Sequence, residues 1–273
     1  MKKQLLFMAL LCVGSLTFAQ KQNDKLDKQI NSLIETENYS EAINNLLELD
    51  AKDGLSEFWL TQLSHCYFLN EQYQECIQSC YRWLSEFGTI GGDGNKFSAY
   101  RYLGNSYLIN DDYGSALIWL KKSLDVIESA DFTDGSWNAS LTDSRINRDM
   151  GATCCLIGVC FVKLGMSNED VPFFKLGMVN RAVLYYKKGI NLQCQYLNIS
   201  IKDVQNGKVH DGVLGAYLRD YGTLYFLLND EADGFEVIKL AALCGDQDAI
   251  AMCREDGINY HQVKAGVLRK LFE

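Results

Sequence analysis

The sequence predicts an all-α protein built from antiparallel helix pairs that stack into a solenoid. A single proline in 273 residues, Pro172, favours long helices over a loop-rich β domain. Three short strings, ENYSEA, EQYQEC and DDYGSA, recur along the chain and end at Ala42, Cys76 and Ala116. Each string is followed by apolar residues at helical spacing, so the three strings mark equivalent positions in a repeated helical unit.

The repeat places about five helix pairs in order along the chain. The steps between the three strings are 34 and 40 residues, and the six-residue excess falls in the glycine-rich stretch at 87–97. We expect long loops there and at 126–146. One helix pair cannot bury its apolar face alone, so the pairs must stack to form a continuous core. The expected pairs cover residues 23–56, 57–90, 97–130, 147–192 with an insertion, and 215–255.

The residues at these positions resemble those of the tetratricopeptide repeat family. That family places a small residue, and an aromatic residue three positions later, in the first helix of each pair. In the second helix, a small residue at the helix crossing is followed four positions later by a bulky apolar residue. The matching residues are Ser64, Tyr67, Cys76 and Cys80 in the second pair, Gly104, Tyr107, Ala116 and Leu120 in the third, Gly158, Phe161, Ala182 and Tyr186 in the fourth, and Gly222, Tyr225, Gly234 and Ile238 in the fifth.

The two ends of the expected solenoid fit the family pattern less closely. The first pair matches mainly in its second helix, at Ala42 and Leu46. After the fifth pair, the segment KLAALCGDQDAIAMCREDG is similar to a Sel-one-like repeat. Its matching residues are Ala241, Ala242, Gly245 and Ala249. The resemblance implies one right-handed superhelical domain over residues 20–273, and the amphipathic segment HQVKAGVLRKLFE is expected to end it as a capping helix.

The first 19 residues predict a secretory signal peptide of bacterial type. Lys2 and Lys3 precede an apolar run, and Ala19 is a small residue at the expected cleavage site. We therefore expect an exported protein, located in the periplasm or outside the cell. No later segment reads as about 18 consecutive uncharged apolar residues, so the sequence predicts no transmembrane helix.

The charge balance argues against nucleic acid as a partner. The chain carries 26 Lys and Arg against 35 Asp and Glu, a net charge of −9, and removal of the leader takes away two of the lysines. Binding to a phosphate backbone requires clustered cations, and so does binding to an anionic lipid surface. We therefore expect a protein or peptide partner rather than nucleic acid.

The cysteines raise the question of metal or redox chemistry. Cys76 and Cys80 occupy the crossing and packing positions where other pairs carry Ala and Leu, so core packing is the favoured interpretation. A disulfide to another helix and a metal site are the alternatives, but the four-residue spacing does not suit a bond between the two thiols. Elsewhere, the pair with the best case for a disulfide is Cys244 and Cys253, since export permits such bonds.

No pattern in the sequence indicates catalysis, a metal or a cofactor. The three histidines, His65, His210 and His261, are not part of an HExxH motif or a nucleophile arrangement. The glycine-rich stretch GGDGN lacks the Lys-Ser/Thr pair of a phosphate-binding loop. We therefore predict that the protein is not an enzyme and has no cofactor or metal site.

The resemblance does imply a binding surface. In the family, the first helices of successive pairs line a concave groove. The corresponding residues here are Asn31, Thr61, His65, Phe68, Arg101, Asn105, Leu108, Arg219, Thr223 and Phe226. Arg101 and Asn105 lie four residues apart on one helix face and resemble part of a clamp for a peptide carboxylate, although Leu156 stands where the next pair would supply an amide. The alternative is an Arg101 that is solvated or paired within the protein.

These observations favour an exported, non-catalytic scaffold that binds a peptide or protein segment in its concave groove. The alternative is a structural or assembly subunit of a bacterial envelope complex, which would use the convex face and the loop insertions.

Overall fold

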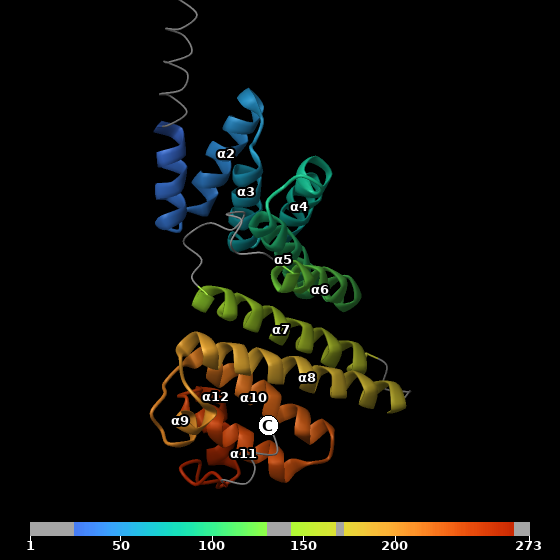
Figure 1. Cartoon of the computed structure of the whole chain (residues 1–273), viewed down its shortest axis with the longest axis vertical. Coiled ribbons are helices and arrows are strands. Elements are labelled where there is room, and N and C mark those ends of the chain that lie inside the picture. Colours follow the sequence, from blue (N-terminus) through green and yellow to red (C-terminus); the bar gives the residue numbers. More distant parts are fainter. Residues whose placement is uncertain (1–24, 130–142, 168–171, 265–273) are drawn as a thin grey trace, which may run out of the picture. The chain divides into compact units, whose positions relative to one another are not determined.

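The computed structural model describes residues 25–129, 143–167 and 172–264, and these residues form helices and no strands (Figure 1). The prediction of an all-α fold made of consecutive helix pairs is confirmed. The chain divides into two compact units, Met1–Thr89 and Ile90–Glu273. That the two units continue one another as a single domain over residues 20–273 stays a prediction, and the leader lies outside the described residues.

The described residues of the first unit form two helix pairs. Residues 25–35 and α2 (Tyr39–Asp53) form the first pair, and α3 (Glu57–Leu69) and α4 (Tyr73–Phe87) form the second. The turn inside each pair contains a non-glycine residue in the left-handed region, Glu37 and Glu71, with φ values of 59° and 60°. Equivalent turns in the second unit contain Asp111 and Asn229. Because such backbone is costly for residues with a side chain, its recurrence marks the repeat independently of the apolar pattern.

The described residues of the second unit form three further helix pairs and two additional helices. These elements are α5 (Asp93–Ile109), α6 (Tyr113–Ser129), α7 (Asp143–Met166), α8 (Pro172–Leu197), α9 (Ile201–Gln205), α10 (Gly212–Leu227), α11 (Glu231–Leu243) and α12 (Gln247–Glu255). Helices α7 and α8 lie side by side over most of their length (Figure 1). Helix α10 packs against both α8 and α11, so one apolar core extends from α5 to α12.

The small residues predicted for the first helix of a pair lie close to the bulky residues predicted for the second helix. A Cβ atom added to Gly104 would come within 2.5 Å of the Leu120 side chain, and one added to Gly158 would come within 2.6 Å of the Tyr186 ring. In the second pair, the Ser64 hydroxyl instead lies 2.8 Å from the hydroxyl of Ser79, beside Cys80. The two helices of each of these pairs thus approach closely because one of them carries a small residue at the crossing.

Several predicted boundaries were wrong. The loop expected at 87–97 is shorter, because α5 begins at Asp93, whose carboxylate is favourable in the first turn of a helix. The insertion expected to interrupt the fourth pair is helical from Pro172 onward, since proline is well tolerated at the first position of a helix. The short helix α9 was not predicted. Residues 261–264 of the expected capping helix are not helical, and its remaining residues lie outside the described part of the chain.

Helix α7 bears on the prediction that no segment after the leader spans a membrane. Among the described residues, the stretch Arg145–Met166 is long and apolar enough by length and composition. Half of its most apolar window is buried within the structure, and α7 packs against α6 and α8. A core helix passes the same test, so this stretch is only weak evidence for a membrane span.

The described cysteines form part of the core. All nine are buried and form no disulfide, and Cys76 and Cys80 are fully buried as the packing interpretation predicts. Cys244 and Cys253 are also free, so the disulfide considered for them is not formed in this structure. Burial raises the pKa of Cys66 and of Cys154 to about 12, which keeps both thiols protonated at neutral pH.

We expect the native protein to resist alkylation at all nine of these positions. The thiolate is the reactive form of cysteine. Burial keeps the thiol protonated and also prevents the reagent from reaching the sulfur atom. Labelling with iodoacetamide before and after denaturation in guanidinium chloride, counted by intact mass, measures this directly. Rapid native labelling of Cys76 or Cys80 would contradict the packing interpretation.

Candidate functional site

Helix α5 places two of the predicted groove residues in an unusual polar environment. The Arg101 guanidinium lies 5.2 Å from the ring centroid of Phe97, and its Nη1 is 3.4 Å from Oδ1 of Asp149 on α7. Of the two alternatives for Arg101, the structure therefore contains the intramolecular pair. Nε of Arg101 and Oδ1 of Asn105, one turn further along, are both buried without a hydrogen-bond partner.

Residues of α8 and α10 extend this polar environment. Gln193 is only 2% exposed, its Nε2 lies 3.4 Å from Oδ1 of Asp211, and its Oε1 is buried without a partner. Burial is the main cause that raises the pKa of Tyr217, and the charges of Asp211 and Arg101 also act on that hydroxyl. These side chains therefore lie near one another. We call them the Arg101 cluster: Arg101, Asn105, Asp149, Gln193, Asp211 and Tyr217.

Four members of the cluster were missed by sequence reasoning. Asp149 lies two turns before Leu156, which is the position that the family pattern indicates in the fourth pair. Asp149 was missed because that pattern does not extend to the first turns of a helix as long as α7. Gln193 lies on the second helix of its pair, where no groove residue was expected. Asp211 was missed as the N-cap of α10, where its Oδ1 accepts a hydrogen bond from the backbone of Leu214 at 2.7 Å. A capping signal of this kind is readable from sequence.

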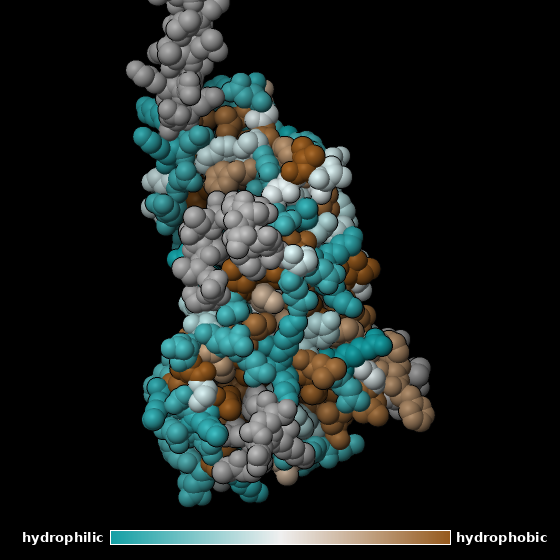
Figure 2. All heavy atoms as spheres, in the orientation of Figure 1, coloured by the Kyte–Doolittle hydropathy of each residue, from teal (hydrophilic) through white to brown (hydrophobic). Residues whose placement is uncertain are grey.

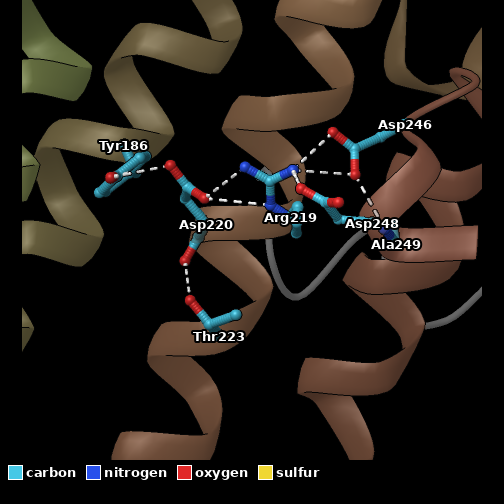
Figure 3. A network of polar contacts seen from close by, with 7 residues as sticks. All are labelled: Tyr186, Arg219, Asp220, Thr223, Asp246, Asp248 and Ala249. Carbon is cyan, nitrogen blue, oxygen red and sulfur yellow. Dashed lines mark hydrogen bonds and ion pairs between the residues drawn. The ribbon is translucent and has the colours of Figure 1, made fainter. Parts of the chain in front are cut away.

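Arg219, another predicted groove residue, forms a network that connects α10 to the start of α12 (Figure 3). Its Nη1 donates to both carboxylate oxygens of Asp246, at 3.1 and 2.9 Å, and to Asp248 at 2.7 Å. Asp246 also caps α12, because its Oδ1 accepts a hydrogen bond from the backbone N–H of Ala249 at 2.8 Å. Arg219 therefore contacts residues of this chain, although the family pattern predicts that its position faces a ligand.

Asp220 occupies the other side of the Arg219 network. Nη2 of Arg219 lies 3.3 Å from its Oδ1, and the Tyr186 hydroxyl lies 3.5 Å from its Oδ2 (Figure 3). Burial is the main cause that raises the pKa of Asp220, and Arg219 offsets part of that rise. The Thr223 hydroxyl donates to the backbone carbonyl of Asp220 at 2.7 Å, so this predicted groove residue is satisfied within its own helix.

The remaining predicted residues of α5 and α10 contact the core. Leu108 is partly buried and packs against the apolar cluster of the second unit. Phe226 packs edge-on against Phe235 at 4.9 Å between ring centroids, and a Cβ atom on Gly234 would lie 3.2 Å from its ring. Phe226 therefore covers the helix crossing of its own pair.

The predicted residues of the first unit differ widely in exposure. Asn31 is exposed, whereas Thr61 is only 5% exposed and donates its hydroxyl hydrogen bond within its own helix. His65 is half-buried, with its ring 6.5 Å from the ring of Tyr39, and Phe68 is half-buried as well. Of these four, Asn31, His65 and Phe68 present surface to solvent.

Metal chemistry finds no support in the described part of the chain. No group of three or more His, Cys, Asp or Glu side chains within it is placed to hold a metal ion. The Arg101 cluster presents hydrogen-bond donors and acceptors from α5, α7, α8 and α10.

Comparison with known proteins identifies the fold. No protein-family model and no curated protein matches the chain. Solved structures do match: MamA residues 41 to the end, from Desulfovibrio magneticus RS-1, is 13% identical with a TM-score of 0.53, covering 81% of this chain and 93% of that one. A Podosopora anserina kinesin light chain structure with nearly identical TPR-like repeats is 13% identical with a TM-score of 0.54, again covering 81% and 93%.

The protein is therefore a tetratricopeptide-like helical repeat protein in its fold, as the residue pattern predicted. At this level of identity the likeness shows the fold alone. The similarity of the last helices to a Sel-one-like repeat stays a prediction.

Proposed function

We propose that the protein is a non-catalytic interaction scaffold that holds an extended peptide or protein segment against the Arg101 cluster. One observation carries the proposal: Nε of Arg101 and Oδ1 of Asn105 are buried on one helix without hydrogen-bond partners. Leaving such an atom unpaired costs about 1–3 kcal/mol. A bound segment offsets this cost when it supplies the missing partners.

The chemistry of an extended peptide matches these atoms. Its backbone N–H groups donate to an oxygen such as Oδ1 of Asn105, and its carbonyl or carboxylate oxygens accept from a guanidinium. Both side chains are partly exposed, so a change of rotamer brings their polar atoms to a ligand. Asp149 is 3.4 Å from Arg101, a long ion pair that holds the guanidinium in place and that a ligand carboxylate could replace.

Binding is tested with a random 12-residue peptide library displayed on phage and selected on the full chain. We expect the variant that combines Arg101→Glu with Asn105→Ala to bind the selected peptides at least tenfold more weakly, with an unchanged circular dichroism spectrum. The tenfold figure corresponds to about 1.4 kcal/mol, the scale of one or two lost hydrogen bonds. Arg254→Glu is the matched control, since Arg254 is an exposed arginine on α12. Equal affinity in all three proteins would refute the proposal.

We further propose that the protein is exported through its first 19 residues. A cationic start, an apolar run and a small residue at the cleavage position support this proposal. Expression in a bacterial host, followed by fractionation and N-terminal sequencing, should give a mature chain that begins at Gln20. An uncut chain found only in the cytoplasm would contradict export.

A further inference from the structure

Gln193 is the most deeply buried member of the Arg101 cluster. It is only 2% exposed, whereas the side chains of Arg101 and Asp149 are 24% and 19% exposed. Its Nε2 donates to Oδ1 of Asp211 at 3.4 Å. Because an ionised carboxylate only accepts hydrogen bonds, this contact fixes which end of the Gln193 amide faces Asp211. The other end, Oε1, is buried without a hydrogen-bond partner, so the protein leaves this acceptor unused.

Helix α7 brings Gln193 and Arg101 close to one another. Arg101 pairs with Asp149 of α7 at 3.4 Å. Two residues further along that helix, a Cβ atom on Gly151 would lie 3.5 Å from the backbone nitrogen of Gln193. Asn105 follows Arg101 by one turn on α5. Arg101 and Gln193 therefore approach neighbouring residues of one helix, from α5 and from α8.

Three unpaired atoms define what the Arg101 cluster lacks. Of the buried side-chain polar atoms without a partner in the described part of the chain, three belong to this cluster: Nε of Arg101, Oδ1 of Asn105 and Oε1 of Gln193. On the face that Figure 2 shows, hydrophilic side chains lie at the surface of the second unit, where water can pair with them. The three atoms of the cluster are instead enclosed. They comprise one donor and two acceptors, so their complement is a group with two donors and one acceptor.

A primary carboxamide has this composition. Its nitrogen carries two N–H donors and its oxygen accepts. A carboxylate only accepts, an ammonium or guanidinium group only donates, and a backbone peptide group offers a single N–H. Because Gln193 lies deeper than Arg101, the matching group must also stand at the end of a side chain. Asparagine and glutamine are the two side chains that meet both conditions.

We propose that an asparagine or glutamine side chain of the bound segment anchors it at the Arg101 cluster, donating to Asn105 and Gln193 and accepting from Arg101. This inference rests on the proposed function and names the ligand group that the cluster selects. Charge is not the basis of the selection, since Asp149 is paired with both Arg101 and Arg148. Binding through neutral hydrogen bonds should therefore depend little on salt.

Gln193→Met separates ligand binding from stability. Methionine has nearly the shape of glutamine but offers no amide, and Asp211 keeps its hydrogen bond from the backbone of Leu214 at 2.7 Å. Replacing a partly paired buried polar group by an apolar group of the same shape is nearly neutral or stabilising. We therefore expect the urea midpoint of the free variant to stay the same or rise. A lower midpoint combined with unchanged peptide affinity would assign Gln193 to the fold alone and overturn the proposal.

The binding test uses the peptides selected on the full chain from the 12-residue phage library, labelled with fluorescein and titrated by fluorescence anisotropy. In each peptide, every asparagine or glutamine is changed singly to the matching acid and to leucine. We expect one position per peptide at which either change weakens binding at least tenfold. Gln193→Met should weaken binding of the parent peptide by a similar factor and leave the affinity of its leucine variant unchanged. Such coupling in a double-mutant cycle indicates direct contact.

Gln195→Met is the matched control, because Gln195 is exposed on the same helix. This control should bind every peptide like the unmodified protein. Selected peptides without asparagine or glutamine would overturn the amide anchor. So would full affinity of all the acid and leucine variants, which is the result expected if only ordered water pairs with the three atoms.

The failure of this inference differs from the failure of the proposed function. If the combined Arg101→Glu and Asn105→Ala variant weakens binding but the amide substitutions do not, only the amide anchor is wrong. If that variant binds every selected peptide with unchanged affinity, or if the library yields no peptide, the proposed function is wrong and the amide anchor fails with it.

Discussion

Replacing Gly189 with alanine is expected to lower the free energy of unfolding of the second unit by about 3 kcal/mol, at the upper end of what overpacking costs. A Cβ atom at this position would lie 2.5 Å from Sγ of Cys155 and 2.8 Å from the carbonyl oxygen of Gly151. The thiol could rotate away, but the carbonyl belongs to the backbone of α7. Because a Cβ atom on Gly151 would in turn lie 3.0 Å from the Gly189 carbonyl oxygen, the two helices meet through a reciprocal contact of glycines.

Gly177 is the matched control, since it lies in α8 as well. A Cβ atom there meets nothing within 4 Å, and Gly177→Ala should raise stability by about 0.5–1 kcal/mol through the higher helix propensity of alanine. Urea denaturation followed by circular dichroism measures both variants. If both alanines shift the midpoint in the same direction, close backbone approach is not what requires glycine at position 189.

The second large effect is expected from Asp246→Ala. This substitution removes the N-cap of α12, worth about 1 kcal/mol, and also the buried partner of Arg219. Because Asp246 is only 8% exposed, we expect a total loss of about 2–4 kcal/mol of stability. The amides of α12 should lose protection first, which hydrogen–deuterium exchange with mass spectrometry can localise to residues 247–255.

Asp248→Ala provides the comparison within the same network. The Asp248 carboxylate also accepts from Arg219, at 2.7 Å, but its side chain is 78% exposed and caps no helix that the structure describes. An exposed ion pair contributes little, so its removal should leave exchange in α12 nearly unchanged. Similar deprotection of α12 in both variants would show that burial and capping at Asp246 are not the cause.

Much of the fold could be predicted because the repeat constrains residues that must touch. Gly104 and Leu120 were assigned by pattern alone, and the structure places one against the other. Boundaries were harder, since they depend on local energies that the repeat does not encode. Residues 172–178 extend α8 beyond the family length, and neither helix propensity nor the apolar pattern distinguishes such an extension from a loop.

The candidate site could be predicted only in part. The family pattern placed Arg101 in a helix, where the structure has it, but it did not indicate that the partner of Arg101 is Asp149 on the next pair. That contact depends on how two pairs stack, which a single sequence does not specify. Thr61, Arg219 and Phe226 show the opposite problem, because these predicted groove residues make internal contacts in this structure.

The buried thiols have a consequence for how the protein survives unfolding. A chain that opens in an oxidising solution exposes these nine cysteines to solvent, and each can then be oxidised or form a mismatched disulfide. Because the native structure contains none of these bonds among its described residues, every one that forms is non-native and opposes refolding. Persistence of the protein under such conditions is therefore governed by its rate of opening rather than by its equilibrium stability.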